Sequence, residues 1–116
     1  MDVKGFYTEI GGSYKDALAI MMNDMLISRM LAKFINGDSV PQMISQYEQK
    51  DYRALFASSH SLKGVAGNLA LSPLYELASI ITEATRNSDN VNLDNEISKL
   101  KTTYEGIKAS YSKYIG

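Results

Sequence analysis

The sequence predicts an all-α domain: an up-and-down antiparallel four-helix bundle with short additional helices at the N-terminal end. Apolar residues recur at spacings of three and four along nearly the whole chain and nowhere alternate at two, which is the periodicity of helices. Short turn-like segments separate the candidate helices, and short connections favour antiparallel neighbours. With 116 residues and 45% hydrophobic content, the chain can build one domain around one core.

The N-terminal part of the chain carries the first helix signals. Residues 1–12 are expected to form an arm or linker, and the folded domain is expected to span 13–116. Ser13, with Asp16 three residues later, resembles a capping box that opens a helix. The Asn-Asp pair at 23–24 either breaks this helix or lies within it.

Further stop and start signals divide the next segment. The apolar stripe continues to Phe34, and Gly37 supplies a stop. Ser39 is a possible cap for a short helix over about 40–48, and Asp51 can cap the helix that follows.

The C-terminal half is predicted to contain three of the bundle helices. Ser72 followed by Pro73 ends one helix and starts the next, because proline fits the first helical turn. The turn-like stretch RNSDNVN at 86–92 ends that second helix. The last helix has a coiled-coil-like seam, with seven apolar positions at alternating spacings of four and three: Leu93, Ile97, Leu100, Tyr104, Ile107, Tyr111 and Tyr114.

The only histidine, His60, is predicted to point away from the core. At about 100° per residue, four apolar side chains lie within roughly 40° of the side opposite it: Leu55, Leu62, Val65 and Leu69. Gly64, Gly67 and Phe56 lie within about 40° of the imidazole, and Lys63 lies within about 60°. A histidine, a lysine and two glycines therefore share one outward stripe.

The two glycines on this stripe need an explanation. Each costs about 1 kcal/mol relative to alanine inside a helix, which indicates that another body approaches closely. That body is either an N-terminal helix folded over Gly64 and Gly67 or a separate protein, and periodicity does not choose between them.

The residue types on this stripe fit phosphoryl chemistry best. A neutral imidazole is a nucleophile that can hold a phosphoryl group on nitrogen, and Lys63 adds a charge for the phosphate oxygens. No metal site is expected, because the single histidine has no carboxylate at i+3 or i+4. A hydrolase that uses His60 as a base would need an acidic partner in the folded structure.

Composition excludes several other functions. The net charge of −1 gives no nucleic-acid footprint, and no GxxxxGK loop for a nucleotide is present. The chain has no cysteine, and its apolar runs are too short to span a bilayer. We therefore expect a cytoplasmic domain that makes no membrane contact and has no kinase activity of its own.

The stretch HSLKGVAGNL at 60–69 resembles the signature of histidine-containing phosphotransfer (HPt) domains of two-component phosphorelays, roughly H-x-L-K-G-x-A-x-x-L-G. Residues 17–34 are similar to the first helices of that family, which end in a phenylalanine about 26 residues before the histidine, as Phe34 does here. Residues 71–89 resemble the helix after the active one. The resemblance covers about 100 residues.

The resemblance implies a phosphorelay intermediate. His60 would accept a phosphoryl group from a receiver-domain aspartate and pass it to another, with Lys63 stabilising the group. Gly64 and Gly67 would give clearance, and Phe56 would belong to the docking surface. The implied partners are response-regulator receiver domains and a hybrid histidine kinase. The domain itself is expected to be a monomer. No cofactor is implied for the domain itself, because the receiver brings the Mg²⁺.

Some positions depart from the family pattern. Thr82 stands where many members have a glutamine that orients the imidazole, and because threonine is shorter, the positioning of the imidazole would rely on water or another group. Arg86 stands where some members carry an additional basic residue near the site, although a solvated charge at a helix end is an equal reading. A non-catalytic adaptor, which binds receivers without being phosphorylated, remains the alternative.

Overall fold

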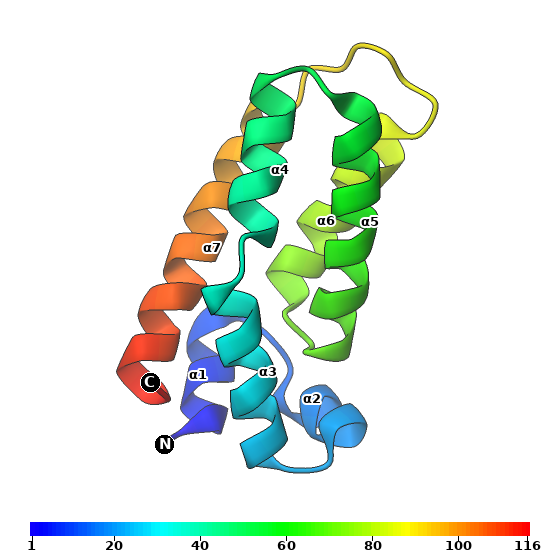
Figure 1. Ribbon diagram of the computed structural model, residues 1–116. Coiled ribbons are helices and arrows are strands. Elements are labelled where there is room, and N and C mark those ends of the chain that lie inside the picture. Colours follow the sequence, from blue (N-terminus) through cyan, green and yellow to red (C-terminus); the bar gives the residue numbers. More distant parts are fainter.

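The computed structural model describes residues 1–116 and contains seven helices: α1 (Val3–Ile10), α2 (Tyr14–Met21), α3 (Asp24–Asn36), α4 (Ser39–Glu48), α5 (Tyr52–Asn68), α6 (Ser72–Thr85) and α7 (Asp94–Tyr114). The last four run alternately up and down as an antiparallel bundle, which confirms the predicted fold class (Figure 1). α5 packs between α4 and α6, and α7 contacts both α4 and α6 to close the bundle. The three N-terminal helices gather at one end (Figure 1).

Polar caps separate the N-terminal helices. The Ser13 hydroxyl accepts a hydrogen bond from the Asp16 amide at 3.2 Å, which confirms the predicted cap of α2. Met22 has a positive φ of 79°, and the side-chain oxygen of Asn23 accepts a hydrogen bond from the Leu26 amide at 2.8 Å. The helix is therefore interrupted at the Asn-Asp pair, which marks the boundary between α2 and α3.

The boundaries of α3, α4 and α5 follow the sequence with one correction. α3 ends at Gly37, as predicted, and α4 lies above it, roughly end to end with it (Figure 1). The prediction that Ser39 caps α4 is wrong, because Ser39 is already helical and Asp38 occupies the cap position without a side-chain hydrogen bond. Asp51 caps α5, as predicted, by accepting a hydrogen bond from the Ala54 amide at 3.2 Å.

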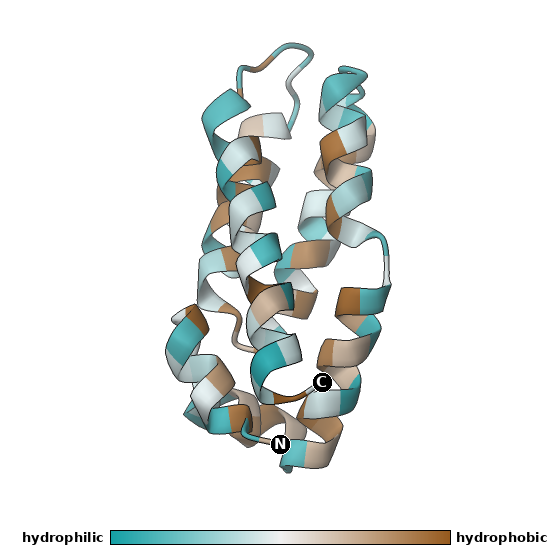
Figure 2. Cartoon of the chain, turned by 90° about the vertical axis from the view of Figure 1, so that its left-hand side faces the viewer, coloured by the Kyte–Doolittle hydropathy of each residue, from teal (hydrophilic) through white to brown (hydrophobic).

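One hydrophobic core contains side chains from all seven helices. Hydrophilic and apolar segments alternate along the helices, as expected for helices with one buried face (Figure 2). The seam of α7 is buried from Leu93 to Ile107, whereas Tyr111 and Tyr114 are only partly buried. No helix combines the length and the apolar character that crossing a membrane requires.

The segment expected to be an arm or linker contains α1, which belongs to this core. Val3, Phe6 and Tyr7 are buried, and the Tyr7 hydroxyl donates a hydrogen bond to the Leu69 carbonyl oxygen at 2.6 Å. Burial raises the pKa of Tyr7, so the hydroxyl keeps the proton that it donates. α1 thus supports the C-terminal end of α5, the helix that carries His60.

Replacing Tyr7 by phenylalanine is expected to lower the free energy of unfolding by about 1–3 kcal/mol, because the buried Leu69 carbonyl would lose its partner. Urea denaturation of both proteins measures the difference. Tyr111→Phe is the matched control at a partly buried tyrosine, and we expect it to change stability by less than about 0.5 kcal/mol. Equal losses in the two variants would contradict a stabilising role for the Tyr7 hydrogen bond.

Candidate functional site

His60 lies on the exposed face of α5. Leu55, Leu62 and Leu69 are buried on the opposite side of the helix, as the helical wheel predicts. Neither ion pair of the structure involves His60, and no group of three or more histidine, aspartate or glutamate side chains forms a metal site. The structure therefore offers the hydrolase interpretation no acidic partner for this histidine.

Val65 does not face the core, although the wheel predicts it there. Its side chain is 40% exposed. The start of α4, at Ser39, lies beside Ser61, one turn before Val65 on α5. Because α4 does not reach further along α5, nothing from that helix covers Val65.

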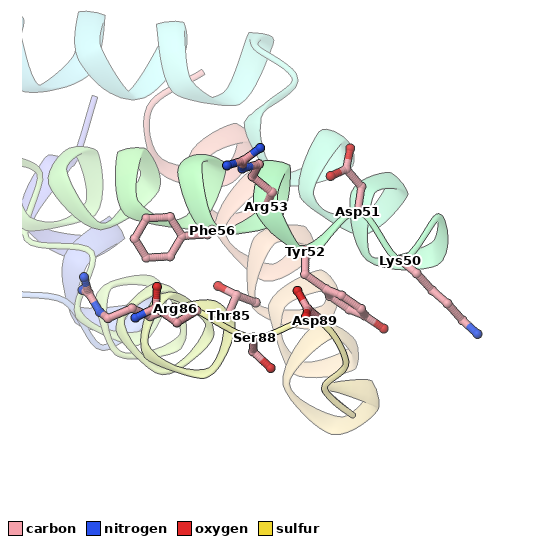
Figure 3. A pocket seen from close by; sticks show the side chains of 10 residues that line it. Lys50, Asp51, Tyr52, Arg53, Phe56, Thr85, Arg86, Ser88 and Asp89 are labelled. Atoms are coloured by element: carbon pink, nitrogen blue, oxygen red, sulfur yellow. The ribbon is translucent and has the colours of Figure 1, made fainter.

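Phe56 connects His60 with the end of α6. The Phe56 and His60 rings stack with their centroids 6.2 Å apart and their planes inclined by 25°. The Arg86 guanidinium carbon lies 5.2 Å from the centroid of Phe56, and Figure 3 shows these two side chains next to each other. Phe56 thus contacts both the imidazole of His60 and Arg86, the residue that directly follows α6.

Lys63 lies one turn after His60 and is directed towards α6. Its ammonium nitrogen is 5.8 Å from the ring centroid of Tyr75, a distance at which a cation is attracted to an aromatic face. Tyr75 is 41% exposed. A second cation near His60 is therefore held by an aromatic side chain of the neighbouring helix.

The two glycines of α5 have different surroundings. A Cβ atom added at Gly64 would meet no atom within 4 Å, so this position is open to an approaching molecule. A Cβ atom added at Gly67 would lie 3.5 Å from the Tyr75 ring, an ordinary van der Waals contact. Within the chain, the side chain that Gly67 approaches is thus Tyr75 of α6, whereas Gly64 has open space beside it.

Thr82 is buried between α5 and α6 and does not support the imidazole as the family pattern suggests. Its side chain is 1% exposed, and its hydroxyl donates to the Ala78 carbonyl oxygen at 2.7 Å and lies 2.9 Å from the Ser59 hydroxyl oxygen. Ser59 is on the inner face of α5, next to His60 in sequence but turned away from it. The short threonine side chain therefore joins the two helices instead of reaching the surface.

Arg86 forms an ion pair with Glu83 one turn earlier on α6. Two guanidinium nitrogens of Arg86 donate to the Glu83 carboxylate at 3.0 and 3.4 Å. The hydrogen bonds from Arg86, together with its charge, lower the pKa of Glu83. Arg86 is thus paired with a carboxylate that the sequence did not single out.

A polar cleft adjoins this face, between the start of α5 and the end of α6 (Figure 3). Phe56 and Arg86 line it together with charged side chains from the first turn of α5 and from the surrounding turns, among them Lys50, Arg53 and Asp89. This border of the His60 face is therefore charged and mixed in sign.

The sequence reasoning missed Tyr75 and Glu83. Both are on α6, where Tyr75 contacts Lys63 and Glu83 pairs with Arg86. The signal that could have found them is the register of the α5–α6 hairpin, because the short connection over 69–71 fixes which turns of α6 lie beside His60.

The family model described as Hpt domain matches residues 27–110. Since this match covers most of the chain, the protein belongs to the Hpt domain family, whose members carry phosphoryl groups on histidine in two-component signalling and are not kinases. Searches of curated proteins and of solved structures found no match. Hpt domains typically interact with receiver domains and histidine kinases.

Proposed function

We propose that this Hpt domain is a phosphorelay intermediate that acts as a monomer in the cytoplasm. His60 accepts a phosphoryl group from the aspartyl phosphate of one receiver domain and passes it to the aspartate of another. The observation that carries the proposal is the position of His60: exposed on α5, with open space beside it at Gly64. Family membership supports the same reading.

In the transfer step, the lone pair of Nε2 of His60 forms the N–P bond. The bond between phosphorus and the aspartyl oxygen breaks, and its electron pair remains on the receiver's carboxylate. Nδ1 keeps its proton, so the imidazole becomes cationic as the dianionic phosphoryl group arrives. The reverse reaction delivers the group to a second receiver, and each receiver supplies its own Mg²⁺.

The chain's own residues bind and orient in this reaction. Gly64 leaves the backbone bare where the receiver's active site must approach, and Phe56 stacks on the imidazole and limits its rotation. Lys63 is one turn away and can turn from the Tyr75 ring towards phosphoryl oxygens, because an exposed cation–π contact is weak, about 0.5–1 kcal/mol.

The test is to incubate the chain with a receiver domain carrying labelled phosphate and Mg²⁺. We expect label to reach the chain within the lifetime of the aspartyl phosphate, to be acid-labile as a phosphoramidate is, and to map to the peptide that contains His60. Addition of a second, unphosphorylated receiver should then remove it. Receiver binding without label on the chain would instead support the adaptor alternative.

A further inference from the structure

We infer that Glu83 is a regulatory positioning residue of this site: in the unphosphorylated chain its carboxylate holds Arg86, and it competes with a phosphoryl group on His60 for that cation. The inference rests on the proposed function. It assigns to one exposed carboxylate of α6 an effect on two quantities: the lifetime of the phosphoryl group on His60, and its equilibrium distribution between His60 and a receiver.

The contacts of Arg86 carry the first step. Its guanidinium binds both oxygens of Glu83, at 3.0 and 3.4 Å, while packing 5.2 Å from the centroid of Phe56. Phe56 in turn stacks on His60. Arg86 therefore packs on the aromatic neighbour of His60, with two of its five N–H donors bound to Glu83.

The ion pairing of Arg86 carries the second step. The structure holds two ion pairs, and Arg86 belongs to one of them, the pair with Glu83. Lys63 forms neither pair and lies 5.8 Å from the centroid of the Tyr75 ring. Glu83 is therefore the carboxylate that Arg86 would have to leave in order to bind a phosphoryl group.

A phosphoryl group on His60 changes this balance. It brings more negative charge than a carboxylate and three acceptor oxygens, and guanidinium groups bind such oxygens in a bidentate manner. The Arg86–Glu83 pair is exposed on both sides, with 49% and 66% of the two side chains accessible, so water can replace either partner readily. Arg86 can therefore exchange Glu83 for the phosphoryl group, and the competing carboxylate limits how firmly the group is held.

The experiment measures how labelled phosphate divides between a receiver and the chain at equilibrium, and the half-life of the label on the isolated phosphorylated chain. In Glu83→Gln, we expect the ratio of chain-bound to receiver-bound label to rise about two- to fivefold, a range typical of one exposed ion pair, and the half-life to lengthen. Both gains should shrink in high salt, because exposed charges are screened. Glu76→Gln is the matched control, since it removes the same charge from an exposed position of the same helix.

A second variant separates this mechanism from a general loss of negative charge. In Glu83→Gln combined with Arg86→Gln, the gain should disappear, because the cation released by the first change is gone. The inference is overturned if Glu83→Gln behaves like Glu76→Gln, or if the gain survives in the double variant. Label on the wild-type chain with no difference among variants defeats this inference alone, whereas no label on any of them defeats the proposed function too.

Discussion

Replacing His60 by glutamine is expected to abolish transfer of labelled phosphate from a phosphorylated receiver while leaving the fold intact. The glutamine amide is close to imidazole in length but has no nucleophilic lone pair on nitrogen. His60 is exposed and takes part in neither ion pair, so the change should alter the free energy of unfolding by less than about 0.5 kcal/mol. Label incorporation and thermal unfolding are measured on the same preparations.

The control for this variant is Ser61→Ala, the exposed neighbouring position on α5, which should take up label at the wild-type rate. The chain offers a particularly clear reading, because His60 is its only histidine and no second imidazole can replace it. Acid-labile label on the His60→Gln variant would show that the acceptor lies elsewhere. If the variant takes up no label, its thermal unfolding curve shows whether the loss of label comes from a loss of folding.

Local signals in the sequence were sufficient to predict most helices and the direction of His60. Ser13, Asp51 and Gly37 lie where helices begin or end because capping and termination depend on a few neighbouring residues. The outward position of His60 follows from the angle between it and Leu55 or Leu62, which a regular helix fixes. Such features need no knowledge of the rest of the fold.

Features that depend on neighbouring helices were not predictable in this way. The wheel gives the direction of Val65 but not the length of the helix beside it, and Val65 is exposed because α4 begins too late to cover it. The role of α1 depends on a hydrogen bond between Tyr7 and Leu69, which are far apart in sequence. Periodicity within either segment carries no information about that contact.

The residues of the candidate site also divide into those predictable from local sequence and those that depend on neighbouring helices. The motif around His60 and Lys63 is local and could be recognised, whereas the pairing of Arg86 with Glu83 and of Lys63 with Tyr75 depends on the register of α5 against α6. Thr82 shows why family position alone can mislead: the place of a longer, surface-reaching side chain is taken by a short one that bonds inside the α5–α6 interface. The aromatic ring that stacks on the imidazole in this chain is that of Phe56.

Replacing Gly64 by glutamine is expected to slow receiver-to-chain transfer on the order of 100-fold without destabilising the domain. A Cβ at this position meets no atom within 4 Å, so the chain itself accommodates the side chain. Glutamine also favours helix more than glycine does, and stability should rise by about 0.5 kcal/mol. The longer side chain would instead occupy the space that a docking receiver needs, and a displacement of about 1 Å in the reacting groups can cost about 100-fold in rate.

Gly106 on α7 provides the matched control, because it is the other glycine inside a helix at which an added Cβ meets nothing within 4 Å. Gly106→Gln should raise stability to a similar extent and leave the transfer rate unchanged, since α7 does not contribute to the His60 face. Rapid-quench measurement of label transfer, with urea denaturation on both variants, separates the two effects. Equal transfer rates in the two variants would mean that receivers do not approach over Gly64, and the docking geometry proposed for α5 would have to be abandoned.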